Sequence, residues 1–250
     1  MALKKKKGSL GVGVYRLYSE KEKDLYIGAL VAQWEKERKT PRVQKKPFIT
    51  VSREFGCMAL EMGLRFTERL DKLNDGGPKW MMYDREIVKR IASDLKMSER
   101  LVEIITASSR TRVRKYMDAH FEKWPSEDEV FQNMVHVTRS ICEKGNAVVV
   151  GFAACKIAQD LPKGFHIRIV APVEWRIEQV ASFYKISKEA AKKRIHLTDG
   201  GRASFFRNRF KEDVRNPYLF DLILNQAKLS MDQIVGCVIH AMKEKGLVTG

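Results

Sequence analysis

The residues between 187 and 215 have the clearest capacity for chemistry in this 250-residue sequence. From Lys192 to Arg215 they hold eight lysines or arginines against three acidic residues, interleaved with Phe205, Phe206 and Phe210. A cationic segment of this kind can close over phosphate groups and exclude water. A solvated pair of basic helices would carry the same charge, but a solvated face has no use for three phenylalanines. We therefore expect a lid over about residues 187–215.

A second segment with chemical potential runs from Ile49 to Gly63 and reads as strand, turn and helix, with Gly56 in the turn. The start of a helix after a tight turn offers free N–H groups and the positive end of the helix dipole to a phosphate. A glycine between a strand and a helix is common, so this segment alone is a weak signal.

Alternating strand and helix patterns must position these segments. A helix is expected over about residues 58–73, helical patterns dominate from Asp84 to Lys144, and Ser230 begins a last helix. The expected strands are short apolar runs, namely Phe48–Ser52, Ala147–Val150, His166–Val170 and Leu219–Leu224. Apolar strands separated by helices predict an α/β fold, with a parallel sheet covered by helices on both faces.

The ligand site of such a sheet lies beyond the carboxyl ends of its strands. That rule selects four loops: Arg53–Ala59, Gly151–Ala154, Ala171–Arg176 and Asn225–Leu229. Asp84 and Arg85 stand where the helical pattern begins, and an aspartate at a helix start is an ordinary cap.

Six stretches in order resemble the cytidylate kinase-like family over roughly residues 47–245. They are Ile49–Gly56 (ITVSREFG), Tyr83–Ile91 (YDREIVKRI), Val148–Ala154, His166–Arg176 (HIRIVAPVEWR), the Arg194, Asp199 and Arg202 lid, and Tyr218–Asn225 before a Leu-Ser pair. The resemblance implies a P-loop NTPase-type fold and ATP-dependent phosphorylation of a pyrimidine nucleoside monophosphate, CMP. It also implies ATP and Mg²⁺ as cofactors.

The resemblance also assigns roles to residues. The turn Arg53–Leu60 would receive the donor phosphates, and Asp199 would orient the lid arginines. Asp84 and Arg85 would approach the acceptor, and for Asp84 this role and that of a helix cap are equally well supported. The lid set is Arg194, Asp199, Arg202, Arg207 and Arg209. The nucleotide-binding set is Ser52, Arg53, Gly56, Ala59, Leu60, Asp84, Arg85, Gly151, Arg168 and Arg176.

Two departures from the family pattern fall on the phosphate-binding loops. The family continues Ser-Gly-Gly-[Arg/Lys] after its first Gly, whereas this chain has Cys57, Met58, Ala59 and Leu60. The family's Gly-Arg-Gly after the middle strand is here a Gly followed by Phe152 and Ala. Losing a charge-assisted contact to a transferring phosphoryl group costs on the order of 10²–10³ in rate. A kinase-fold binding or regulatory protein without turnover is therefore an alternative function.

The formal net charge of +16 indicates an anionic partner. Residues 1–46 hold 13 lysines and arginines against 5 acidic residues, and they read as a basic extension with a helix over about 20–38 and a linker over 39–46. We expect a cytidylate kinase-like domain over 47–250. Nucleic-acid binding through residues 1–46 is a third hypothesis, and a solvated tail is the simpler interpretation of its lysines.

The remaining composition indicates a cytoplasmic protein. No apolar run reaches the roughly 18 residues of a membrane span, and no secretory signal is recognised. The four cysteines are far apart and no histidine stands at zinc-ligand spacing, so no residue is assigned to a metal. The sequence makes no prediction of oligomeric state.

Overall fold

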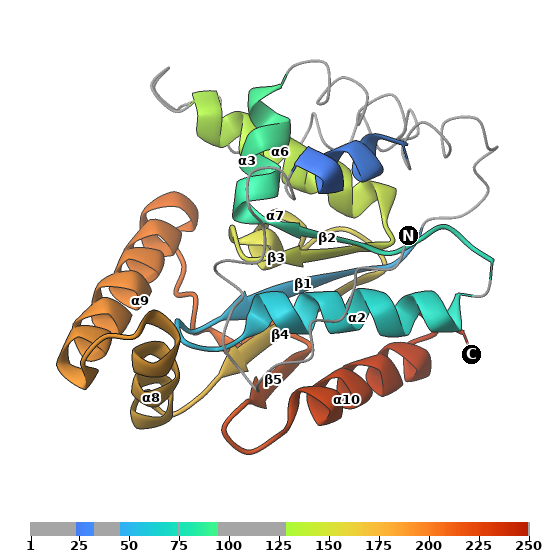
Figure 1. Cartoon of the computed structure of the whole chain (residues 1–250). Helices are drawn as coiled ribbons and strands as arrows, with labels where there is room; N and C mark the ends of the chain where they lie inside the picture. Colours follow the sequence, from blue (N-terminus) through green and yellow to red (C-terminus); the bar gives the residue numbers. More distant parts are fainter. Residues whose placement is uncertain (1–23, 33–45, 75, 95–128, 250) are drawn as a thin grey trace.

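The computed structural model describes residues 24–32, 46–74, 76–94 and 129–249 (Figure 1). Within these residues all strands belong to one sheet, whose pairings are parallel and whose order is β2-β3-β1-β4-β5. The strands are β1 (Phe48–Arg53), β2 (Met81–Asp84), β3 (Ala147–Val150), β4 (Gly164–Val170) and β5 (Leu222–Asn225). The prediction of a parallel α/β sheet is confirmed.

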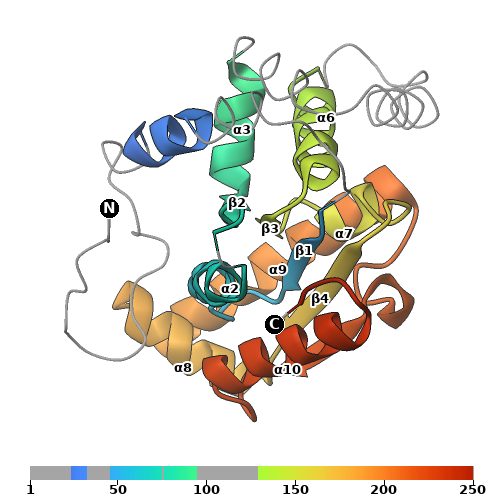
Figure 2. The same cartoon turned by 90° about the vertical axis from the view of Figure 1, so that its right-hand side faces the viewer.

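Helices cover both faces of the sheet. The helices are α2 (Ala59–Leu73), α3 (Arg85–Ser93), α6 (Glu129–Lys144), α7 (Ala154–Ile157), α8 (Val173–Tyr184), α9 (Lys188–Phe210) and α10 (Met231–Glu244), with a 3-10 turn, η2, at Pro217–Leu219. One face packs against α2 and α10, and the other against α3, α6 and α7 (Figures 1 and 2).

The alternation within β1 shows how the two faces are built. Ile49 and Val51 join the core under α2 and α10, whereas Phe48 joins the core under α3 and α6. Successive side chains of a strand point to opposite faces, so a strand buried on both sides reads as a continuous apolar run. Thr50 and Ser52 break that run on the second face, which puts polar groups near the carboxyl end of the sheet.

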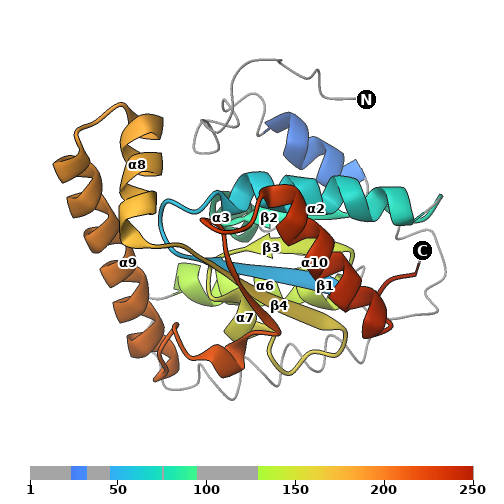
Figure 3. The same cartoon turned by 90° about the horizontal axis from the view of Figure 1, so that it is seen from below.

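The predicted lid is a single helix, α9. It runs without interruption through Gly200 and Gly201 and begins at Ser187, whose side chain accepts a hydrogen bond from the Ala190 N–H. With α8 it stands beside the carboxyl ends of the strands (Figure 3). The loops that the sequence selected therefore open toward α9.

Three strands differ from the sequence-based expectation. β2 was not expected as a strand, and it ends at Asp84, where the helical pattern was expected to begin and whose side chain caps α3 through the Ile87 N–H. β5 begins at Leu222 rather than 219, because Pro217 and the Asn216 side chain stabilise the η2 turn first. The expected strand at 166–170 begins two residues earlier, at Gly164.

A short helix over residues 24–32 packs against the second face of the sheet, beside α3 (Figure 1). Leu30 is fully buried there. The Tyr26 hydroxyl donates to the Met82 carbonyl at 2.7 Å and accepts from the Met82 N–H at 3.0 Å. This part of the extension is thus packed on the domain, although the boundary near residue 46 stays a prediction. Both ends of the helix expected over about 20–38, and all but the last residue of the linker expected over 39–46, lie outside the described residues.

Candidate functional site

A cleft of about 1110 Å³ opens at the carboxyl ends of β1, β2, β3 and β4. It is bounded by α9 on one side and by the start of α3 on the other. Predicted site residues that line it are Ser52, Arg53, Leu60, Asp84, Arg85, Gly151, Arg168, Arg194, Asp199, Arg202 and Arg207. The tertiary structure therefore brings together most of a set that spans more than 150 residues of sequence.

Four predicted residues lie elsewhere. Gly56 and Ala59 line a smaller neighbouring pocket of about 60 Å³ between the loop and α8. Arg176 is buried behind the loop. Arg209 leaves the cleft, and its guanidinium lies 4.9 Å from the centre of the Phe131 ring. Arg209 was predicted to belong to the lid set, but it does not line the cleft.

The loop between β1 and α2 has the course of a phosphate loop. Gly56 has φ +97°, and a Cβ there would lie 3.0 Å from the Arg176 Cβ, so a side chain would be strained and crowded. Helix α2 begins after Met58 with no side chain capping it. An uncapped helix start of this kind is a favourable place for an anion.

Several N–H groups of this loop are nevertheless bound within the protein, including the two at the start of α2. The Met58 N–H donates to the Gln226 side-chain oxygen at 3.0 Å, and the Ala59 N–H donates to the Cys57 carbonyl at 2.9 Å. Because Leu60 brings no cation, the loop offers less to a donor phosphate than the family pattern implies. Burial, with the charge of Glu54 as a second cause, raises the pKa of the Cys57 thiol to about 12, so this thiol is neutral.

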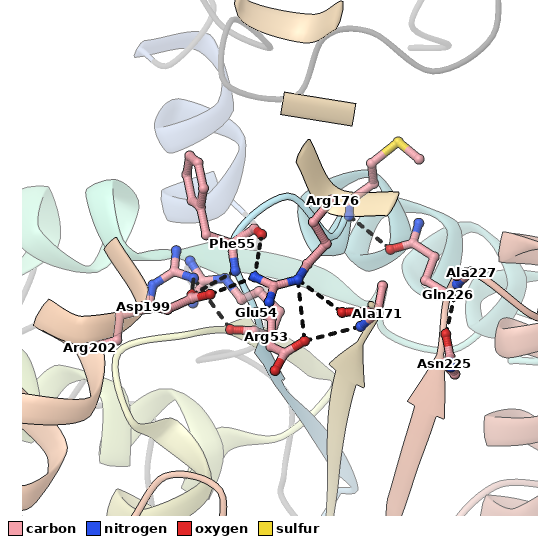
Figure 4. A network of polar contacts seen from close by, with 11 residues as sticks. Arg53, Glu54, Phe55, Ala171, Arg176, Asp199, Arg202, Asn225, Gln226 and Ala227 are labelled. Atoms are coloured by element: carbon pink, nitrogen blue, oxygen red, sulfur yellow. Dashed lines mark hydrogen bonds and ion pairs between the residues drawn. The ribbon is translucent and has the colours of Figure 1, made fainter. Parts of the chain in front are cut away.

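Asp199 connects the lid helix to the loop (Figure 4). Its carboxylate accepts from the Phe55 N–H at 2.8 Å and from the Arg176 guanidinium at 2.6 Å. Arg176 also donates to the carbonyls of Phe55 and Ala171 and lies 3.5 Å from the Glu54 carboxylate. The network fixes the loop, the end of β4 and the middle of α9 relative to one another.

The lid arginines pack on aromatic rings beside the loop. Arg194 lies 3.7 Å from the centre of the Tyr184 ring, a cation–π contact. Arg202 lies 5.7 Å from the centre of the Phe55 ring and donates to the Arg53 carbonyl at 3.3 Å. Asp199 lies 3.6 Å from Arg202, so the expected orientation of a lid arginine by this carboxylate agrees with the geometry.

The loop after β3 has lost its cation and gained an aromatic cluster. Phe152 and Ala153 both have positive φ, +52° and +53°, a conformation that costs about 1–2 kcal/mol for residues with a Cβ. The Phe152 ring centre lies 5.6 Å from that of Phe131 and 6.4 Å from that of Phe205. Phe152 thus helps to hold α9 where the family pattern has an arginine for the acceptor phosphate.

The floor of the cleft carries charges from neighbouring strands. The Arg53 guanidinium lies against Gly151, since a Cβ on that glycine would come within 1.9 Å of it. Burial raises the pKa of the Asp84 carboxyl above its usual value of 3.8, while the Ile87 N–H and the Arg53 charge oppose the shift. Arg168 reaches the floor from β4 and donates to the Ser52 hydroxyl at 3.1 Å.

Gln226 and Arg215 are site residues that sequence reasoning missed. Gln226 follows β5 inside one of the four selected loops, so its position was available, but its bond to the Met58 N–H depends on folding. Arg215 lines the cleft and pairs with Asp213 at 2.7 Å. In the sequence Arg215 is only one of the eight lysines and arginines between 192 and 215, and nothing there indicates that it would face the cleft.

The described residues include no group of three or more His, Cys, Asp or Glu side chains that could hold a metal ion. The loop does not fit a bound donor triphosphate well either, because Leu60 replaces the cation and the Met58 N–H is already bonded. Within the described ranges, no helix is long and apolar enough to cross a membrane.

A parallel sheet of this kind, with a phosphate-loop turn and an arginine-rich lid helix over one cleft, defines a nucleotide kinase-like protein. The model of the cytidylate kinase-like family matches residues 48–228. The chain belongs to that family, which confirms the resemblance seen in the sequence.

Among the solved structures that this chain is similar to, one with a TM-score of 0.62 supports the fold. An uncharacterized protein from Eubacterium ventriosum is 16% identical with a TM-score of 0.62, over 80% of this chain and 99% of that one. Shikimate kinase from Bacteroides thetaiotaomicron is 10% identical with a TM-score of 0.42, over 80% and 99% of the two chains. Dephospho-CoA kinase from Campylobacter jejuni is 14% identical with a TM-score of 0.34, over 82% and 99%. No curated protein matches the sequence.

Proposed function

We propose that this protein binds a nucleoside monophosphate in the cleft and that its phosphotransfer from ATP is far slower than that of an ordinary kinase. The observation that supports the proposal is a contrast between two parts of one site. Arg168, Arg202 and Arg207 line the cleft, whereas the loop that should hold the donor has Leu60 in place of the family's cation. The family makes CMP the first acceptor to test.

The charges of the site explain why a monophosphate should bind better than ATP. Phosphate groups bind most strongly to guanidinium groups that are already in place and shielded from water. The cleft offers several such groups to a monophosphate. The donor loop offers backbone N–H groups, of which those of Met58 and Ala59 are bonded within the protein. Transition-state stabilisation of phosphoryl transfer depends on such fixed positive charge and donors, so their loss reduces turnover.

Calorimetric titration with CMP and, separately, with ATP in the presence of Mg²⁺ tests this function. We expect CMP to bind more tightly than ATP. Cytidine serves as a matched ligand without the phosphate, and it should bind much more weakly than CMP. Tighter binding of ATP than of every monophosphate tested would contradict the proposal.

A second candidate function is a binding or regulatory role with no turnover. The Gln226 side chain on the Met58 N–H favours it, because a neutral amide oxygen stands at the start of α2 where a phosphate oxygen would need that donor. Single-turnover measurement of CMP-dependent ADP formation separates the two functions. Slow formation supports a weak kinase, and none above the enzyme-free rate supports the binding role.

A further inference from the structure

Three arginines are buried in the part of the chain that the structure describes: Arg139, Arg168 and Arg176. Their side chains are shielded to a similar degree, with 1%, 6% and 8% of their surface exposed. A buried guanidinium that lacks a charged partner is strongly destabilising, so such residues are normally paired. Their partners therefore indicate which of them serve the fold.

Arg139 and Arg176 are each paired with a carboxylate within the protein. Arg139 donates to both oxygens of Asp160 at 2.6 and 2.8 Å and to the Ile157 carbonyl at 2.7 Å. Arg176 donates to Asp199 and two carbonyls and has a second carboxylate, Glu54, at 3.5 Å. Both arrangements match those of structural arginines.

Arg168 is different. Among the described residues it has one hydrogen bond, to the neutral Ser52 hydroxyl, and no carboxylate within ion-pair distance. Its other close neighbour is the Phe220 ring, whose centre lies 5.8 Å from the guanidinium. Burial lowers the pKa of Arg168, and the more distant charges of Glu54 and Asp199 offset that shift only in part. Within the part of the chain that the structure describes, this buried charge therefore has no counter-ion in contact with it.

The position of Arg168 directs it at the ligand site. It pairs in register with Ser52 across β1 and β4. This pair lies two residues beyond that of Thr50 with His166, which is joined by a 2.7 Å hydrogen bond. These four polar side chains share the sheet face opposite the α2 and α10 core. Ser52 and Arg168 stand at the carboxyl end of that row, where both line the cleft.

We propose that Arg168 holds the phosphate group of the bound monophosphate, as the counter-charge lost when Phe152 replaced the family's arginine. This inference rests on the proposed function and names the residue that would recognise its substrate. Ser52 is a positioning residue that orients the guanidinium. Arg207 lines the same cleft and supplies a second cation, while Arg215 is already paired with Asp213.

The substitution Arg168→Met tests this role, because it keeps the length of the side chain and removes its charge. An anion-holding residue and a structural residue give opposite results in the ligand-free protein. If Arg168 awaits an anion, the variant should be at least as stable as the wild type without ligand. If Arg168 supports the fold, the variant should lose stability as Arg139→Met does.

Thermal unfolding is measured with no addition and with inorganic phosphate, CMP or cytidine. We expect phosphate and CMP to stabilise the wild type and cytidine to do so much less. Arg168→Met should bind CMP about 10–100-fold more weakly, which corresponds to one charge-assisted contact, and should no longer distinguish CMP from cytidine. Arg168→Lys should recover part of that difference.

Arg65→Met is the matched control, since Arg65 is a half-exposed arginine of α2 outside the cleft, paired with Glu61 and Asp232. It should bind CMP as the wild type does. The assignment is wrong if Arg168→Met still binds CMP more tightly than cytidine, or if this variant fails to fold. It is also wrong if neither phosphate nor CMP stabilises the wild type. If inorganic phosphate stabilises the wild type but not Arg168→Met, and CMP binds no more tightly than phosphate, Arg168 forms an anion site that does not recognise a nucleotide.

Discussion

The carboxylate of Asp199 accepts a 2.6 Å hydrogen bond from the guanidinium of Arg176, 23 residues earlier in the chain. The same carboxylate accepts from the Phe55 N–H, so one side chain of the lid helix connects α8, α9 and the phosphate loop. A lid held in this way is part of the folded structure in the absence of ligand. Opening it requires breaking a charged contact that is largely shielded from water.

Replacing Asp199 should therefore loosen the lid. Asp199→Ala removes the partner of Arg176 and the acceptor of the Phe55 N–H, and we expect a loss of about 2 kcal/mol in the free energy of unfolding. Asp199→Asn keeps an acceptor and should lose less. Hydrogen exchange at the Phe55 amide and along α9 provides the local measurement. Unchanged protection in Asp199→Ala would show that other contacts hold α9.

Repair of the two altered loops tests whether they limit phosphotransfer. Met58→Gly, Ala59→Gly and Leu60→Arg together restore backbone approach and a cation on the donor side, and Phe152→Arg restores the acceptor cation. Because both act on one transition state, we expect each repair alone to give little and the combination to exceed their product. The measurement is CMP-dependent ADP formation by wild type, each repair and the combination.

The structure adds one further repair and one control to that experiment. Gln226→Ser belongs with the donor repair, because the Gln226 oxygen bonds the amide of residue 58. Phe152→Leu removes the ring from the Phe131 and Phe205 cluster without adding a cation, and so measures the cost of loosening α9. Wild-type turnover of roughly 1–100 s⁻¹ would show that the altered loops do not slow phosphotransfer. A folded, CMP-binding combination that stayed inert would show that these loops are not the cause.

The helix over residues 24–32 offers a matched pair of leucines. Leu30 is fully buried, whereas Leu25 is 67% exposed on the same helix. Leu30→Ala should lower the free energy of unfolding by about 2–5 kcal/mol, and Leu25→Ala should change it by no more than about 0.5 kcal/mol. Denaturant unfolding measures both. Equal, small effects would show that this helix does not contribute to the core.

Deleting residues 1–46 extends the same test. The deletion removes Leu30 and leaves the Met82 N–H and carbonyl without the Tyr26 hydroxyl. We expect a folded domain of lower stability rather than an unchanged one. If the truncated protein keeps the wild-type unfolding midpoint, the domain boundary lies in the linker over 39–46, as the sequence alone predicted.

The stability contribution of Asp84 should depend on pH. Burial raises the pKa of its carboxyl in the folded protein, so the ionised form costs stability above that pKa and the cost decreases as the pH falls toward 3.8. Asp84→Asn keeps the cap on the Ile87 N–H and removes the charge. It should be more stable than the wild type at pH 7, by a margin that shrinks in acid.

Asp84→Ala is the control for the cap. It loses the same charge but also the acceptor of the Ile87 N–H, so it should be about 1 kcal/mol less stable than Asp84→Asn at every pH. Thermal unfolding at several pH values measures the series. A stability advantage of Asp84→Asn that did not change with pH would rule out titration of Asp84 as its cause.

The sequence by itself determined the layered fold and the edge of the sheet at which the cleft opens. Ala147–Val150 is apolar on both faces, and β1 and β4 each have one continuous apolar face, with Ile49 and Val51 on β1. Short apolar runs of this kind, separated by helices, predict buried parallel strands. Parallel strands place their ligand loops at one edge. Local signals also gave the caps at Ser187 and Ser230, because a capping side chain and its N–H lie within three residues.

Tertiary structure decided which charged groups are satisfied. Arg168 and Arg176 read alike in the sequence, eight residues apart. Only folding brings Asp199 to Arg176, and it leaves Arg168 with a hydroxyl. Gln226 likewise reaches the Met58 N–H across 168 residues of chain. Sequence patterns report short-range periodicity, whereas the pairing of a buried charge depends on contacts between distant segments, and these contacts determine what the cleft can bind.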